Sequence, residues 1–138
     1  LARGIGEHLL SLSLPLADYV VAFPGTGLAT AGVFTDAALK RDSAPCPAEV
    51  FGLDYGHNDL QPVAERLQPR IAELATAFAR AGATPRMTGS GACVFARVSD
   101  GASARVLADR LRTDGWQSWA IRSIARHPLF GFANGATI

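Results

Sequence analysis

The clearest hydrophobic pattern in the chain lies between Asn58 and Gly82. Apolar residues recur there every three or four positions, which predicts a helix with one apolar face. These residues are Val63, Leu67, Ile71, Leu74 and Phe78. Asn58 is a good N-cap with Gln61 at the reciprocal capping position, and Gly82 is a good C-terminal stop. Pro69 lies inside the segment, so we expect it to kink or divide the helix.

Strand patterns stand on both sides of this segment. The sequence "DYVVAFPG" is rich in β-branched and aromatic residues, which predicts a buried central strand ending at the turn Pro24-Gly25. Alternating apolar residues predict further strands over 92–98 and 116–124. In the last of these, the residues on related positions are Trp116, Ala120 and Ile124. Residues 5–14 predict an edge strand or a hairpin.

Two shorter helices complete the predicted order of elements. The sequence "TAGVFTDAAL" predicts a helix that Thr30 can cap, and 99–113 predicts another that Gly115 closes. Their apolar residues are Val33, Phe34 and Ala37 in the first, and Val106, Leu107 and Leu111 in the second. Residues 40–56 combine prolines, glycines and charges, which predicts a loop. The order favours an α+β fold of ferredoxin-like type, with helices on one face of a mostly antiparallel four-stranded sheet.

The composition is that of one globular domain. Of 138 residues, 49% are hydrophobic and 18% charged, which is enough apolar content to bury a core. The net charge of +1 gives no basic field that would recruit nucleic acid. The apolar stretches are far shorter than the roughly 20 residues of a membrane helix. We therefore expect a cytoplasmic protein without a nucleic-acid or membrane partner, in which Cys46 and Cys93 are reduced and Cys93 is buried.

The segment "MTGSG" is the first candidate for chemistry. Gly89 and Gly91 stand on either side of Ser90, directly before a predicted strand. Such a loop can direct backbone N–H groups towards an anion, with the hydroxyls of Thr88 and Ser90 as further donors. A purely structural turn would use glycine here as well.

A second glycine-bearing turn lies in "FPGTGLATAGVF". It leads into the helix that begins near Thr30, and a helix start also favours an anion. Phe34 in that helix either stacks on a ring of a ligand or packs in the core. We expect the two turns to line one cleft.

Several catalytic patterns do not occur in the sequence. There is no G-x-x-x-x-G-K-[ST], and no G-x-G-x-x-G between a strand and a helix, so a complete cradle for nucleotide phosphates is missing. Ser90 does not fit the nucleophile pattern G-x-S-x-G, because Thr88 stands at its first glycine. His8, His57 and His127 lie in unrelated contexts, so we expect no metal site.

Four segments together resemble a known kinase family. They are "ARGIGEHL", "VVAFPGTGLATAGVF", "NDLQPVAERLQPRIAEL" and "PRMTGSGACVFARV". From about Ala2 to Val98 they are similar to the C-terminal half of the 4-diphosphocytidyl-2-C-methyl-D-erythritol kinases, a family of the GHMP kinase superfamily. These kinases transfer the γ-phosphate of ATP to the 2-hydroxyl of 4-diphosphocytidyl-2-C-methyl-D-erythritol, in the non-mevalonate route to isoprenoids.

The resemblance implies a domain assignment and site residues. Residues 1–138 correspond to the ferredoxin-like GHMP kinase C-terminal domain, with 1–17 as the end of the segment that joins it to an N-terminal ATP-binding domain. Thr30 and Phe34 match the substrate site, where the aromatic ring stacks on cytosine. The loop 88–91 matches a motif that faces the phosphates of ATP and the substrate. Ala31 is a departure, because the family usually has proline at this position.

The resemblance places the catalytic machinery outside this chain. In the family the Gly-rich ATP loop, the catalytic aspartate and its partner lysine belong to the N-terminal half. We therefore expect no catalytic residue in this chain and no kinase activity from it alone. The implied partners are the small-molecule substrate and the N-terminal domain, which would hold most of the ATP and Mg²⁺.

Two other classes of function stay open at this point. Ferredoxin-like domains also serve as stand-alone regulatory modules that bind a small effector. RNA-binding domains of the same fold use exposed aromatic pairs on the sheet, and the sequence does not indicate such a pair.

Overall fold

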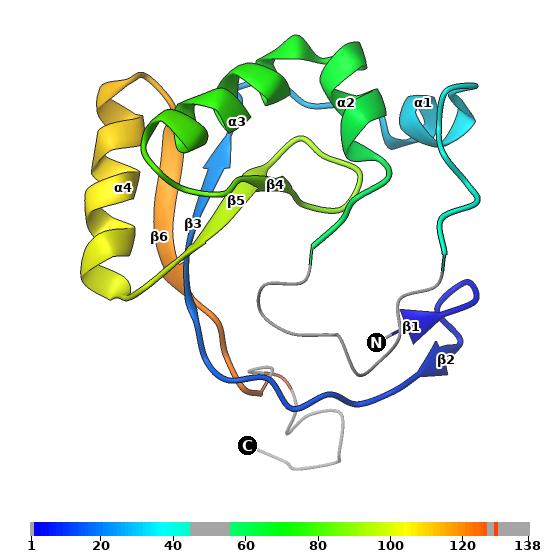
Figure 1. Ribbon diagram of the computed structural model, residues 1–138, viewed down its shortest axis with the longest axis horizontal. Helices are drawn as coiled ribbons and strands as arrows, with labels where there is room; N and C mark the ends of the chain where they lie inside the picture. Colours follow the sequence, from blue (N-terminus) through cyan, green and yellow to red (C-terminus); the bar gives the residue numbers. More distant parts are fainter. Residues whose placement is uncertain (1, 45–55, 127–128, 130–138) are drawn as a thin grey trace.

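A four-stranded sheet organises the computed structural model, which describes residues 2–44, 56–126 and 129 (Figure 1). The strands are β3 (Asp18–Phe23), β4 (Arg86–Met87), β5 (Val94–Val98) and β6 (Gln117–Arg122). They lie in the order β4-β5-β3-β6, with antiparallel neighbours throughout. The helices are α1 (Thr30–Thr35), α2 (Gln61–Leu67) and α3 (Pro69–Arg80) between β3 and β4, and α4 (Gly101–Thr113) between β5 and β6. This is the ferredoxin-like α+β arrangement that the sequence predicts.

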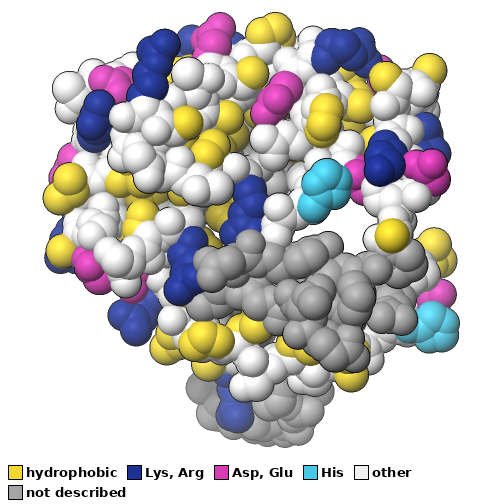
Figure 2. Space-filling model, in the orientation of Figure 1, with side chains coloured by type: hydrophobic (Ala, Val, Ile, Leu, Met, Phe, Trp, Pro, Cys, Tyr) yellow, Lys and Arg dark blue, Asp and Glu magenta, His cyan; other side chains and the backbone are white. Residues whose placement is uncertain are grey.

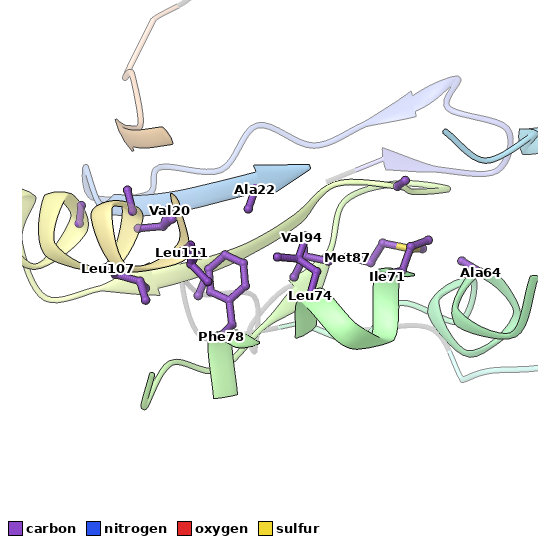
Figure 3. Packing of buried hydrophobic residues seen from close by; sticks show 14 residues of the cluster. Val20, Ala22, Ala64, Ile71, Leu74, Phe78, Met87, Val94, Leu107 and Leu111 are labelled. Atoms are coloured by element: carbon purple, nitrogen blue, oxygen red, sulfur yellow. The ribbon is translucent and has the colours of Figure 1, made fainter. Parts of the chain in front are cut away.

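The core lies on one face of the sheet, where α3 and α4 pack (Figure 3). The central strands contribute Val20 and Val94, both fully buried. Phe78 of α3 and Leu111 of α4 are fully buried against them. Each side chain of this size contributes about 1.5–3 kcal/mol through burial. The core therefore fixes the sheet and two helices. The turns that follow β3 and precede β5 begin and end on this fixed framework.

Pro69 divides the predicted helix 58–82 into α2 and α3, as expected. Gln68 leaves the helical conformation with φ −138° and ψ 87°, and its side chain accepts a hydrogen bond from the N–H of Arg70 at 3.4 Å. Leu67 is 40% exposed, so its place in the predicted apolar stripe is wrong. The reason is that the break after Leu67 ends the common face of the two helices.

Two predicted helix caps are wrong, and one helix stop is confirmed. Ala29 rather than Thr30 is the N-cap of α1, and Leu60 rather than Asn58 is the N-cap of α2. Gly82 follows the end of α3 with φ +80°, the left-handed conformation typical of a helix stop. The side chains of Thr30 and Asn58 bind a loop far away in the sequence, and Asn58 Oδ1 also accepts a hydrogen bond from the N–H of Leu60.

The pattern of α4 and β6 differs from the prediction in detail. Val106 is 70% exposed, whereas the rest of its predicted stripe is buried. In β6 the buried residue is Ser118, whose hydroxyl donates to a carbonyl of α4 at 2.7 Å. Of the three predicted positions, Trp116 packs against the core, but Ala120 and Ile124 are exposed. The reason is that β6 is an edge strand whose partner in this sheet is β3 alone.

The other face of the sheet carries an aromatic pair that the sequence did not indicate. Tyr19 and Phe95 lie edge to face with ring centroids 6.1 Å apart. Both are half-buried, and the guanidinium of Arg86 lies 5.1 Å from the Phe95 ring centroid. Trp119 and Ile121 of β6 are 50% and 44% exposed. Because side chains alternate along a strand, these residues lie opposite the core.

The N-terminal segment forms a hairpin of β1 (Ala2–Arg3) and β2 (His8–Leu9). The hairpin therefore lies earlier than the predicted 5–14. Ile5 at its turn and Leu9 are 101% and 79% exposed.

Some expectations lie partly outside the described residues. Of the loop predicted over 40–56, residues 45–55 with Cys46 are not described, and neither is His127. Cys93 is a free thiol, and it is half-buried rather than buried. In the described ranges, no helix combines the length and the apolar character that crossing a membrane requires.

Candidate functional site

The two glycine-bearing turns meet at a pair of hydroxyl groups. Thr30 Oγ1 lies 2.9 Å from Ser90 Oγ, although the residues are 60 positions apart. Thr30 is the first residue of α1, and Ser90 lies in the loop between β4 and β5. Thr30 is exposed and Ser90 is half-buried, so solvent reaches this point. The structure thus brings the two predicted turns together.

The loop 88–91 has two backbone N–H groups available to a ligand. The N–H of Gly91 donates to the Thr88 carbonyl at 2.9 Å, and the N–H of Thr88 donates to the Cys93 carbonyl at 2.9 Å. Within the described part of the chain, the N–H groups of Gly89 and Ser90 have no hydrogen-bond partner. Two such N–H groups beside a hydroxyl form a suitable site for a phosphate oxygen.

Both glycines of this loop are required by the backbone. Gly89 has φ +50° and Gly91 has φ +100°, and L-residues with side chains rarely adopt these values. A Cβ atom on Gly91 would also lie 3.1 Å from Met87 Sδ and 3.4 Å from Leu28 Cδ2. The glycines flank Ser90 because the chain reverses direction there while it packs closely against neighbouring side chains.

Asn58 and Gln61 connect the start of α2 to this loop. The Asn58 amide N–H groups donate to the carbonyls of Met87 at 3.1 Å and Gly89 at 2.8 Å. Gln61 Oε1 accepts a hydrogen bond from the N–H of Met87 at 3.0 Å. The sequence indicated only capping roles for these amides, because a local pattern carries no signal for partners 26 to 31 positions away.

Phe34 of α1 is 52% exposed, so the core-packing alternative is wrong for this residue. Its neighbour Val33 is the buried residue of the helix. This helix has only six residues, too few for it to be stable by itself. Side chains outside α1 must therefore hold Phe34 in place.

An arginine and an ion pair hold the C-terminal end of α1. Arg41 Nη2 donates to the Phe34 carbonyl at 2.6 Å. The Asp36 carboxylate accepts a hydrogen bond from the N–H of Ala38 at 2.8 Å and forms an ion pair with Arg66 of α2. The Ala38 N–H, followed by Arg66, holds the pKa of Asp36 below its ordinary value. The charged form of Asp36 is therefore favoured, which keeps α1 attached to α2.

A second carboxylate, Asp59, stands beside the start of α2. Its Oδ1 accepts a hydrogen bond from Ser43 Oγ at 2.9 Å and lies 2.6 Å from His57 Nε2. These two contacts, Ser43 first, lower the pKa of Asp59. His57 is exposed, and the described ranges contain no cluster of three side chains suited to a metal ion. In the view of Figure 2, Lys and Arg side chains are dispersed rather than gathered in one patch.

A cleft of about 660 Å³ lies next to this region, between the start of α2 and strands β4 and β5. Asn58 and Gln61 line it, together with His57 and Arg86. Neither Thr30 nor Phe34 lines it, and nor do residues of the loop 88–91. The cleft is therefore distinct from the place where the two turns meet.

Residues 38–115 match the sequence model of the family described as GHMP kinases C terminal. The chain belongs to the GHMP kinase family. The match of this GHMP kinase chain includes Asn58 and the loop 88–91, whereas Thr30 and Phe34 precede it.

Relatives of this GHMP kinase chain include two bacterial proteins named 4-diphosphocytidyl-2-C-methyl-D-erythritol kinase. The one from Cupriavidus necator is 39% identical over an alignment that covers 96% of this chain and 47% of the relative. The one from Nitrosomonas europaea is 40% identical over an alignment that covers 95% of this chain and 48% of the relative. The chain thus spans about half the length of the curated relatives it matches.

A solved structure supports the same relationship. The crystal structure of a 4-(cytidine 5'-diphospho)-2C-methyl-D-erythritol kinase is similar to this GHMP kinase chain with a TM-score of 0.75 and 30% sequence identity. The similarity covers 88% of this chain and 48% of that one. The fold predicted from the family resemblance is therefore confirmed.

Proposed function

We propose that this chain is the C-terminal, substrate-binding half of a kinase that phosphorylates the 2-hydroxyl of 4-diphosphocytidyl-2-C-methyl-D-erythritol with ATP. In this proposal Phe34 stacks on the cytosine ring and Thr30 lies beside the ligand. The loop 88–91 faces the phosphates. The names of the relatives support the choice of substrate.

The observation that carries the proposal is the contact between the two turns. The hydroxyls of Thr30 and Ser90, 2.9 Å apart, join the helix that bears the exposed Phe34 to the loop 88–91. In this loop the N–H groups of Gly89 and Ser90 have no partner among the described residues. An aromatic face suits a nucleobase. Backbone N–H groups and hydroxyls suit the charge that develops on a transferred phosphoryl group. On this proposal the loop meets two groups: the diphosphate of the substrate, whose base stacks on Phe34, and the γ-phosphoryl group that ATP transfers.

We also propose that the catalytic residues, and most of the ATP and Mg²⁺ contacts, come from an N-terminal domain. Phosphoryl transfer relies on positioned charges around the metal-bound nucleotide, and the family resemblance assigns those charges to the other half. On this proposal residues 1–138 form one C-terminal domain. Residues 1–17 are the end of the segment that connects it to the N-terminal domain. ATP would then react in the space between the two domains.

The test is a chimaera in which this chain replaces the C-terminal half of the Nitrosomonas europaea relative. We expect it to transfer phosphate from ATP to 4-diphosphocytidyl-2-C-methyl-D-erythritol, because each half then supplies its own part of the site. The isolated chain should turn over no ATP. Transfer is measured as substrate-dependent ADP formation with the phosphorylated product identified by mass.

The control is the unaltered relative, assayed in parallel. A chimaera that folds, judged by its circular dichroism and melting, but forms no product would contradict the proposal. Full turnover by the isolated chain would contradict the division of roles between the halves.

A further inference from the structure

The Asn58 side chain makes three hydrogen bonds, which join the start of α2 to the end of β4 and to the loop 88–91. Its Oδ1 accepts a hydrogen bond from the N–H of Leu60 at 3.0 Å. Its two amide N–H groups donate to the carbonyls of Met87 and Gly89, at 3.1 Å and 2.8 Å. An amide is the side chain that offers one acceptor and two donors in this geometry. No other natural side chain of its size can satisfy all three groups.

The hydrogen bond from Asn58 to the Gly89 carbonyl also fixes the orientation of the peptide unit between Gly89 and Ser90. In a trans peptide unit the C=O of one residue and the N–H of the next lie in one plane and point in opposite directions. The Gly89 carbonyl points at Asn58, so the N–H of Ser90 points away from Asn58. This N–H has no partner within the described residues. Asn58 therefore sets the direction of a donor that it does not touch.

Gln61 supports the same arrangement from the first turn of α2. Its Oε1 accepts a hydrogen bond from the N–H of Met87 at 3.0 Å, and its amide N–H donates to Glu65 at 2.7 Å. Met87, the residue before the loop, is 2% exposed. Gln61 holds its backbone N–H and Asn58 holds its backbone carbonyl. The remaining freedom lies in the glycine-flanked turn, where the Asn58 bond to Gly89 acts.

We propose that Asn58 is a positioning residue that aims the Ser90 N–H, and with it the Ser90 hydroxyl, at the phosphoryl group in transfer. The inference rests on the proposed kinase function and adds to it a residue outside the ligand-contacting set. Asn58 makes its contribution through the orientation of the loop. Its loss should therefore lower the rate of transfer more than the affinity for the cytidine end of the substrate.

The discriminating variant is Asn58→Asp. It keeps an oxygen acceptor for Leu60 but turns a carboxylate oxygen towards the carbonyls of Met87 and Gly89, which replaces attraction by repulsion. In the chimaera we expect kcat to fall about tenfold or more, since two hydrogen bonds are lost. The KM for the cytidine substrate should rise by a smaller factor than kcat falls, because Phe34, which stacks on the base, does not depend on Asn58. The matched control is Asp59→Asn, since Asp59 bonds to Ser43 and His57 and not to the loop.

A second readout needs no kinase activity. In ¹⁵N-labelled full chain, the Ser90 amide signal should move or broaden in Asn58→Asp and stay in place in Asp59→Asn. Below the pKa of the new carboxyl, ordinarily about 3.9, its O–H can donate to the Gly89 carbonyl, so the signal should return towards its original position. If Asn58→Asp does not fold, Asn58→Ala is used for the same two readouts, without the pH arm.

The outcomes separate this inference from the proposed function. A chimaera with Asn58 that transfers no phosphate contradicts the proposed function, and the Ser90 signal then still decides whether Asn58 orients the loop. An active chimaera whose kcat is unchanged in Asn58→Asp contradicts the positioning role alone. A Ser90 amide signal that stays in place in Asn58→Asp also contradicts it. The same holds if Asn58→Asp raises the substrate KM and leaves kcat unchanged.

Discussion

At the scale of single residues, Phe34 and Val33 show how a six-residue helix can present a ring to solvent. Val33 is fully buried and anchors the helix, while the adjacent Phe34 is 52% exposed. Arg41 and the ion pair between Asp36 and Arg66 hold the C-terminal end of the helix, so the ring is presented on a fixed support. An exposed aromatic side chain that is held in place loses little conformational freedom when a base stacks on it.

Phe34→Ala in the chimaera should raise the KM for 4-diphosphocytidyl-2-C-methyl-D-erythritol about 5- to 150-fold. The reason is that stacking a base on an aromatic ring contributes about 1–3 kcal/mol. The KM for ATP should change much less. Steady-state kinetics with each substrate varied in turn measures both constants. Phe34→Trp, which keeps a stacking surface, serves as the control, and equal effects of Phe34→Ala on both constants would argue against a substrate contact.

At the scale of elements, the sequence carries the information that depends on burial alone. The helices and the strands follow hydrophobic periodicity. Pro69 divides the long helix because proline has no backbone N–H and its ring clashes with the preceding turn. Periodicity overstated the core at Leu67 and Val106, because spacing encodes neither the change of face at the helix break nor which residues at the edge of the apolar stripe of α4 are buried.

The candidate site shows the same limit of prediction. The residue types of the two turns, and the resemblance to a kinase family, pointed to Thr30 and to the loop 88–91. The N-cap positions given to Thr30 and Asn58 were wrong, because Ala29 and Leu60 occupy them, and the sequence did not indicate that both side chains bind a distant loop. A local pattern describes what a side chain can bind within a few residues and does not contain its tertiary partners.

Gly91→Ala tests whether the loop needs the conformation that the structure gives it. We expect a loss of about 1–3 kcal/mol in the free energy of unfolding, from a side chain placed at positive φ. The close approach to Met87 Sδ adds to this loss. Urea denaturation of the full chain measures it.

The matched control is Gly101→Ala at the start of α4. Gly101 has no positive φ, and a Cβ there would lie 3.6 Å or more from its neighbours. Replacing glycine by alanine in such a helical position leaves stability unchanged or slightly raised. Equal stability of the two variants would show that the loop does not need glycine at position 91.

At the scale of the whole molecule, the fold brings together two segments that are distant in the sequence, the start of α1 and the loop 88–91. The sheet order puts β5 beside β3, and the loop that precedes β5 extends towards α2 (Figure 1). The chain that follows β3 forms α1, which packs next to α2 through Val33 and Val63. The start of α2 then holds the loop through Asn58. Helix α1 and the loop 88–91 are thus joined through α2, which is why we treat them as one candidate site.

The most direct test of that claim is a titration of the ¹⁵N-labelled chimaera with 4-diphosphocytidyl-2-C-methyl-D-erythritol, followed by the amide signals of this chain. We expect the signals of 30–35 and 88–91 to shift together, with a common dissociation constant. Shifts confined to one of the two turns, or centred on the 660 Å³ cleft at His57 and Arg86 with both turns unaffected, would contradict it.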